Sequence, residues 1–280
     1  MAIQTINDIS REVLNERSEA ARARYKGAVR PIYGATGKGD PDHIGSSILL
    51  HLAEGHFLLT AAHVLDHNQN TSLYLGGDEL ILLEFEALAT AAPGGNRDED
   101  HDDFAIAPLN NDVLAKLTGA TFITQNEISN QAGSVEGRLY SCLGYPNSKN
   151  KPNPYKGKKV TPMIGTYTSV GRPSTMLPEI ASNQDHILVD HDAKFSRDEN
   201  GCRVSSIALP GFSGGAIIDL GRISADSIAS PPEPKLAALL IEAHAKEKVI
   251  LGTRLTTILE AIRRGVSKVP DTGSADPLPL

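Results

Sequence analysis

The sequence is poor in cysteine: its 280 residues include only Cys142 and Cys202. A secreted protein that depends on disulfides would carry more, so the cysteine content favours a reducing, cytoplasmic environment. No apolar run approaches the roughly 20 residues that a transmembrane helix needs, so we expect no contact with a membrane. The first residues also lack the basic and continuous apolar segments of a signal peptide, which again favours a cytoplasmic protein.

Positive charge is in the minority, because 27 Lys and Arg residues face 34 Asp and Glu residues, giving a net charge of −7. This balance argues against general binding of nucleic acid. Five lysines gather in segment 149–159 with a single aromatic residue, so we interpret it as a solvated loop. The acidic segment 97–103 lacks the spacing of metal ligands, so no metal site is predicted.

Helical spacing is found near the two ends of the chain, and a short helix is also predicted around residues 112–117. Apolar residues recur every three to four positions over residues 5–26, which predicts an amphipathic helix packed on the main domain. A regulatory arm that binds a partner protein is the alternative role for this helix. From residue 28, short apolar segments alternate with turns containing Gly and Pro, as in a β-barrel or sandwich. A second helix is predicted over 256–264.

A serine among glycines, in Gly211-Phe212-Ser213-Gly214-Gly215, is the most distinctive feature of the sequence. Glycines permit backbone angles and close approaches that a side chain forbids. A nucleophilic serine needs such a turn, with backbone N–H groups aimed where an oxyanion forms. The N–H groups of Gly211 and Ser213 are the candidates. The same residues also suit an ordinary turn before a strand, so the hypothesis needs a base and a carboxylate elsewhere.

Two other segments supply these groups. Thr60-Ala61-Ala62-His63 ends a predicted strand and places a histidine beside small residues that another strand end can approach. Asp103 is the last charge before an apolar strand, where a carboxylate can be partly buried behind an imidazole ring; Asp102 is the alternative. A histidine that accepts the proton of Ser213, and an aspartate that orients the ring, complete a nucleophilic site.

The three motifs together resemble those of the trypsin-like serine peptidases, which have the chymotrypsin fold of the PA clan. Thr60-Ala61-Ala62-His63 is similar to the histidine motif, Asp103-Phe104-Ala105-Ile106 to the aspartate motif, and Gly211–Gly215 to the serine motif. The resemblance extends over about residues 28–264 and is nearest to bacterial intracellular members. It implies an all-β protein with two packed six-stranded antiparallel β-barrels and an added helix at each end. It also implies a serine endopeptidase that needs no cofactor.

This resemblance divides the chain into four segments. Residues 1–27 would be an N-terminal helical extension, and 28–120 a first barrel that carries His63 and Asp103. Residues 121–264 would be a second barrel with Ser213 and the terminal helix, and 265–280 a flexible tail.

The resemblance also assigns residues that bind a protein or peptide substrate. Ile207 matches the position at the base of the primary specificity pocket, where an isoleucine favours apolar or small side chains over lysine and arginine. Three residues would line the cleft and pair with the substrate backbone by β-addition: Glu242, Ala243 and His244. Phe212 replaces the aspartate of members activated by a cut N-terminus. We therefore expect control by loop ordering or by a partner, with a stress or defence role as a hypothesis.

Two other classes of protein stay open. One is a trypsin-like scaffold without activity that binds partners through its N-terminal helix. The other is an α/β-hydrolase esterase, since Gly-x-Ser-x-Gly also fits a nucleophile elbow. Its remaining triad members would come from Asp219, Asp226 and His244. The sequence lacks the alternating strands and helices of that fold, which argues against the esterase.

Overall fold

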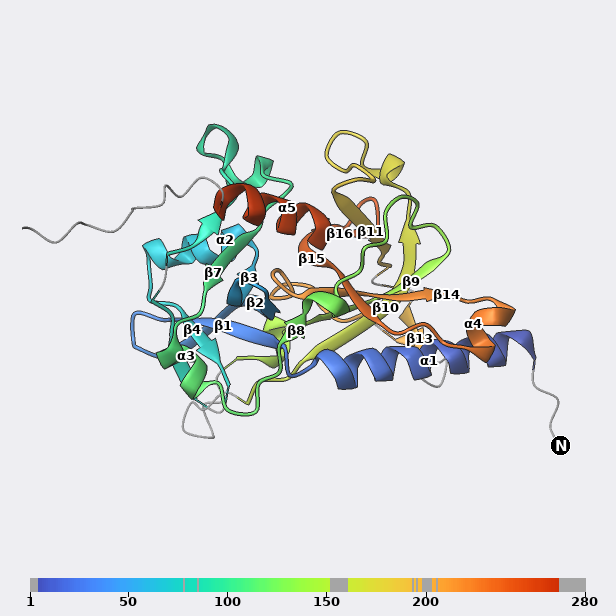
Figure 1. Cartoon of the computed structure of the whole chain (residues 1–280), viewed down its shortest axis with the longest axis horizontal. Helices are drawn as coiled ribbons and strands as arrows, with labels where there is room; N and C mark the ends of the chain where they lie inside the picture. Colours follow the sequence, from blue (N-terminus) through green and yellow to red (C-terminus); the bar gives the residue numbers. More distant parts are fainter. Residues whose placement is uncertain are drawn as a thin grey trace, which may run out of the picture.

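The computed structural model describes residues 5–77, 79–84, 86–151, 161–192, 194, 196–197, 203–204 and 206–266. The chain forms two β-rich halves with a helix near each end (Figure 1). The predicted lysine-rich loop lies mostly outside these residues, as does the predicted tail after residue 266. Among the described helices, none has the length and apolar character that crossing a membrane requires.

The N-terminal half is one eight-stranded sheet in the order β5-β4-β1-β2-β3-β7-β6, with β8 parallel to β2. Its strands are β1 (Val29–Ala35), β2 (Pro41–Leu52), β3 (Gly55–Thr60), β4 (Tyr74–Gly76), β5 (Leu80–Leu82), β6 (Leu88–Ala89), β7 (Ala105–Pro108) and β8 (Ile123–Thr124). The edge strands β5 and β6 have only three and two residues, and no pairing among the described residues closes one onto the other. Among the described residues this half is therefore an open sheet, and not the closed six-stranded barrel that the resemblance implies.

The C-terminal half is a closed, six-stranded antiparallel barrel, as predicted, in the order β10-β11-β16-β15-β14-β9. Its strands are β9 (Arg138–Gly144), β10 (Gly165–Arg172), β11 (His186–Asp190), β14 (Ala216–Arg222), β15 (Lys235–His244) and β16 (Val249–Arg254). Cys142 is a free thiol inside this barrel, where burial raises its pKa to about 12; Cys202 lies outside the described residues. Since an α/β-hydrolase needs a mostly parallel sheet, this architecture rules out the esterase alternative.

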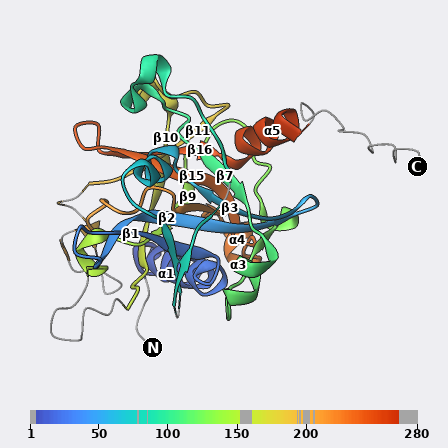
Figure 2. The same ribbon diagram turned by 90° about the vertical axis from the view of Figure 1, so that its left-hand side faces the viewer.

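Short elements connect the strands. The α-helices after α1 (Ile6–Tyr25) are α2 (Ala62–Asp66), α3 (Asn111–Lys116), α4 (Ala225–Ala229) and α5 (Leu255–Val266), and β12 (Ser196–Arg197) pairs with β13 (Arg203–Val204). The 3-10 helices are η1 (His67–Gln69), η2 (Pro93–Gly95), η3 (Arg97–Glu99), η4 (Gln125–Glu127), η5 (Asn147–Lys149) and η7 (Ser174–Met176). The views in Figures 1 and 2 place α5 and α1 on opposite sides of the molecule.

Helix α1 is tied to the C-terminal half beside β9 and β14. It begins at a capping box in which Thr5 and Asp8 exchange hydrogen bonds. The side chain of Arg17 is only 6% exposed. Its guanidinium donates to three carbonyl oxygens, those of Leu220, Arg222 and Ser227. The Tyr25 hydroxyl donates to the Pro234 carbonyl at 2.6 Å. The inner face of α1 is therefore packed against the C-terminal half and hydrogen-bonded to it.

Replacing Arg17 with alanine should lower the free energy of unfolding by about 3 kcal/mol, because three carbonyl oxygens lose a charged donor. Urea denaturation of the purified protein measures the change. Arg22→Ala is the matched control on the same helix, since the Arg22 side chain is 42% exposed and reaches Glu19 only at 3.6 Å. Equal effects of the two substitutions would contradict the docking role of Arg17.

Candidate active site

His63 and Asp103 form a close hydrogen-bonded pair in the N-terminal half. His63 lies in α2, directly after β3, and its Nδ1 is 2.5 Å from Asp103 Oδ2. Its backbone N–H donates to the other carboxylate oxygen at 3.0 Å. Because a carboxylate can only accept, Nδ1 carries the proton and Nε2 keeps its lone pair in the neutral ring. The Asp103 side chain is 3% exposed and that of His63 36%, so the ring shields the carboxylate and keeps an open face.

The acidic loop before β7 is built to place Asp103. Asp103 has a φ of +32°, a left-handed conformation that costs a non-glycine residue about 1–2 kcal/mol. Its N–H donates to Asp100 Oδ1 at 3.0 Å, and its carbonyl accepts from the N–H of Ala62 at 3.2 Å. Asp100 is in turn bound by Arg97 and Thr90. These bonds hold the strained backbone and aim the carboxylate at His63.

Asp102, the alternative acid, points elsewhere. Its side chain is 52% exposed and lies 3.5 Å from Nε2 of His186. Its carbonyl accepts from the hydroxyl of Thr253 at 2.6 Å, which ties the acidic loop to β16. The structure thus brings Asp103, and not Asp102, to His63.

The environment of His63 favours its charged form. Burial alone would lower the pKa of the imidazole, but the hydrogen bond and negative charge of Asp103 oppose this. Asp66 and Glu242 add smaller attractions for a proton. Together they raise the pKa of His63 above its usual value.

The turn that carries Ser213 is fixed by glycines packed against the N-terminal half. Gly211 and Gly214 have φ values of +94° and +85°, which favour glycine. A Cβ atom on Gly214 would lie 1.9 Å from the Ser46 carbonyl oxygen and 2.4 Å from Thr60 Oγ1. Thr60 closes β3, just ahead of His63. The serine turn therefore packs against the strand end that leads to the histidine.

Ser213 and α2 also meet at Gly45 of β2. A Cβ there would lie 2.7 Å from Val64 Cγ2 and 3.1 Å from the Ser213 carbonyl oxygen. The Ser213 hydroxyl donates to the carbonyl of Ile241 at 3.2 Å. Within the described part of the chain, no hydrogen bond joins this hydroxyl to His63.

Backbone amides around Ser213 alternate between bonded and open. The N–H groups of Phe212 and Gly214 donate to carbonyl oxygens at 2.8 Å, those of Leu209 and Leu240. Among the described residues, the N–H groups of Gly211 and Ser213 have no protein acceptor. Two open amides flanking a serine hydroxyl can stabilise an anionic oxygen.

The predicted substrate-binding residues lie in two settings. The carboxylate of Glu242 on β15 lies between two imidazoles, 3.1 Å from His101 Nδ1 and 2.9 Å from His244 Nε2. Ala243 pairs with Ile250 of β16. Ile207 has different neighbours: a Cβ on Gly165 of β10 would lie 2.3 Å from Ile207 Cδ1. The link between Glu242 and His101 joins the two halves, and no sequence motif signals it.

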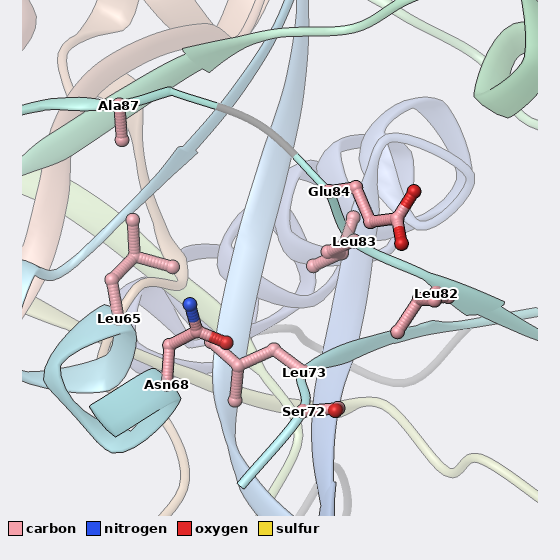
Figure 3. Close-up of a pocket in the computed structure, with 8 residues that line it drawn as sticks. All are labelled: Leu65, Asn68, Ser72, Leu73, Leu82, Leu83, Glu84 and Ala87. Carbon is pink, nitrogen blue, oxygen red and sulfur yellow. The ribbon is translucent and has the colours of Figure 1, made fainter. Parts of the chain in front are cut away.

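A separate pocket lies in the N-terminal half, beside α2, η1 and β5 (Figure 3). It has a volume of about 440 Å³ and a lining of Leu65, Asn68, Ser72, Leu73, Leu82, Leu83, Glu84 and Ala87. None of the predicted site residues lines it. Among the described residues, no three His, Cys, Asp or Glu side chains form a group that could hold a metal ion.

The closed barrel, the second, mostly antiparallel sheet and the helix near each end are consistent with a chymotrypsin-like fold. The chain is similar in structure to the serine endoprotease from Yersinia pestis, with a TM-score of 0.52 and 13% identity, over 90% of this chain and 67% of that one. At this identity the similarity establishes the fold alone.

Two further solved structures match with lower scores. An inactive serine-to-alanine mutant from M. tuberculosis has a TM-score of 0.44 and 12% identity, over 96% of this chain and 98% of that one. A Glu endopeptidase has a TM-score of 0.45 and 13% identity, over 85% of this chain and 90% of that one. No protein-family profile and no curated protein matches the sequence.

Asp103→Asn should lower the pKa of the His63 imidazole by about one unit or more, because it removes the adjacent negative charge. An NMR titration of the histidine ring resonances measures the shift. Asp102→Asn is the control, and it should leave this pKa unchanged to within about 0.3 unit, since its charge lies against His186. A larger shift in Asp102→Asn would reverse the assignment of the acid.

Proposed function

We propose that this protein is a serine endopeptidase that hydrolyses peptide bonds of protein substrates through His63, Asp103 and Ser213. The observation that carries the proposal is the 2.5 Å contact between His63 and Asp103. It fixes the tautomer in which Nε2 can accept a proton, as general-base catalysis by a triad requires. The chymotrypsin-like fold supports the same chemistry.

The reaction begins when the Ser213 hydroxyl turns from the Ile241 carbonyl toward Nε2 of His63. His63 removes the proton as Oγ attacks the substrate carbonyl, and Asp103 stabilises the resulting imidazolium. The N–H groups of Gly211 and Ser213 bind the oxyanion, each contributing about 3–4 kcal/mol to the transition state. His63 then protonates the leaving amine, which departs and leaves an acyl-enzyme. Water, deprotonated by His63, hydrolyses the ester and restores the serine.

Substrate binding in this proposal uses β15 as a template for the peptide backbone, along Glu242, Ala243 and His244. Ile207 at the base of the specificity pocket selects an apolar or small side chain before the cleaved bond. No cofactor takes part. The low cysteine content supports a cytoplasmic setting. An unregulated peptidase would be harmful there, so we propose that a partner or loop ordering controls it, in a stress or defence response.

A catalytically silent scaffold is the second candidate. It is favoured by the Ser213 hydroxyl, which donates to Ile241 and not to His63. Such a protein would bind partners without cleaving them. Reagents that react with an activated serine distinguish the two candidates.

The wild-type protein should react with a fluorophosphonate and cleave a proteome-derived peptide library, and Ser213→Ala should do neither. Mass spectrometry of the cut sites should show a consistent apolar residue before the cleaved bond. His63→Ala should lower kcat/KM at least about 10⁴-fold, because the serine loses its base. His67→Ala, an exposed histidine directly after α2, is the matched control and should keep wild-type activity.

The possible outcomes separate the parts of the proposal. Cuts after lysine or arginine would keep the triad and contradict the role of Ile207. Labelling without cleavage would support a latent peptidase. Absence of both labelling and cleavage would favour the silent scaffold.

A further inference from the structure

The Pro210–Gly211 peptide lies against two polar residues outside the triad. The N–H of Asn147 donates to the Pro210 carbonyl at 2.8 Å. A Cβ on Gly211 would lie 2.1 Å from Asn147 Oδ1 and 2.8 Å from His43 Cε1. His43 and Asn147 thus contact the backbone that carries one of the two open amides.

The bond from Asn147 sets the direction of the Gly211 amide. A trans peptide is planar, so its carbonyl and its N–H point in opposite directions. Because the Pro210 carbonyl is held toward Asn147, the Gly211 N–H faces away from Asn147. Rotation of this peptide would break the bond and withdraw the amide from the anion position.

Asn147 is itself anchored by His43. Its Oδ1 lies 2.6 Å from Nδ1 of His43, and a carbonyl oxygen accepts, so the imidazole donates. The side chain of His43 on β2 is only 6% exposed, and its ring packs edge-on against that of Tyr33 at 5.3 Å. Close packing allows such a ring little freedom to turn. It therefore gives Asn147 a fixed point of attachment in the other half of the molecule.

Ser46 fixes the far side of the same glycine. Its hydroxyl donates to the Gly211 carbonyl at 2.7 Å and accepts from the N–H of Tyr145 at 2.9 Å. Its own N–H donates to the Ser213 carbonyl at 2.8 Å. The carbonyls on both sides of the Gly211 amide are therefore bound, one by Asn147 and one by Ser46.

We infer that His43 and Asn147 are positioning residues that hold the Gly211 amide in the orientation needed to bind the oxyanion, an inference that rests on the proposed function. His43 belongs to the N-terminal half, whereas Asn147 follows β9 of the C-terminal half. The oxyanion site is therefore complete only when the two halves are packed together.

Asn147→Ala tests the inference because it removes the side-chain anchor and keeps the backbone N–H. We expect kcat to fall about tenfold to hundredfold, part of the effect of losing an oxyanion donor, with KM within about threefold. The inhibition constant of a peptide aldehyde, whose adduct places an oxyanion in the site, should rise by a similar factor. Asn147→Asp keeps an oxygen acceptor for His43 and should restore kcat to within about threefold of wild type.

Asn110→Ala is the matched control. The Asn110 side chain accepts from the N–H of Val113 at 2.9 Å and caps α3, so the same truncation costs stability at a remote position. It should leave kcat and aldehyde affinity unchanged. Wild-type kcat and aldehyde affinity in Asn147→Ala would overturn the inference, as would equal losses in Asn110→Ala.

Crystal structures of the wild type and of Asn147→Ala separate this inference from the proposed function. A rotated or disordered 210–211 peptide in Asn147→Ala would support the positioning role of His43 and Asn147 even if the wild type neither cleaves peptides nor reacts with a fluorophosphonate. In that case the proposed function fails and the structural role of the pair stands. An unchanged peptide in Asn147→Ala would overturn the inference, whatever the activity of the wild type.

Discussion

Burial of the Asp103 carboxylate is the constraint on which the site depends. A buried charge is costly unless it is paired and hydrogen-bonded, and Asp103 meets both conditions through the ring and the backbone N–H of His63. The left-handed backbone at Asp103 is held by Asp100, whose own charge is balanced by Arg97. A chain of short-range bonds thus runs from an arginine on the acidic loop to the imidazole. Without it, neither the tautomer nor the orientation of the ring would be fixed.

The turn that carries Ser213 is held differently, by close packing of its backbone against the N-terminal half. Gly214 has no room for a side chain beside Ser46 and Thr60. Ser46 then bonds to both Gly211 and Ser213, so one small residue of β2 holds the serine turn in place. The candidate nucleophile and the candidate base are thereby placed by contacts across the junction. A substitution that loosens the packing between the two halves should therefore also disturb the geometry of the site.

The three motifs could be predicted because each is local in the sequence and carries its own turn chemistry. The contacts that arrange them could not. His43 and Asn147 are separated by 104 positions and belong to no motif, so only the folded chain brings them together. The amphipathic pattern predicts helix α1, but it does not predict that the charged Arg17 side chain faces the barrel. There its guanidinium donates hydrogen bonds to three carbonyl oxygens. The open form of the first sheet could not be predicted either, because its edge strands have only three and two residues, too few for an alternating pattern to reveal them.

The resting position of the Ser213 hydroxyl limits how such a site could be regulated. Turning it from Ile241 to His63 exchanges one hydrogen bond for another, and the net worth of one such bond is about 1 kcal/mol. A partner that acted on this rotation alone could change the rate by no more than about tenfold. Loss of an oxyanion donor changes it by about 10²–10³-fold. In the proposed peptidase, displacement of the Gly211 amide would therefore change the rate more than rotation of the serine hydroxyl would.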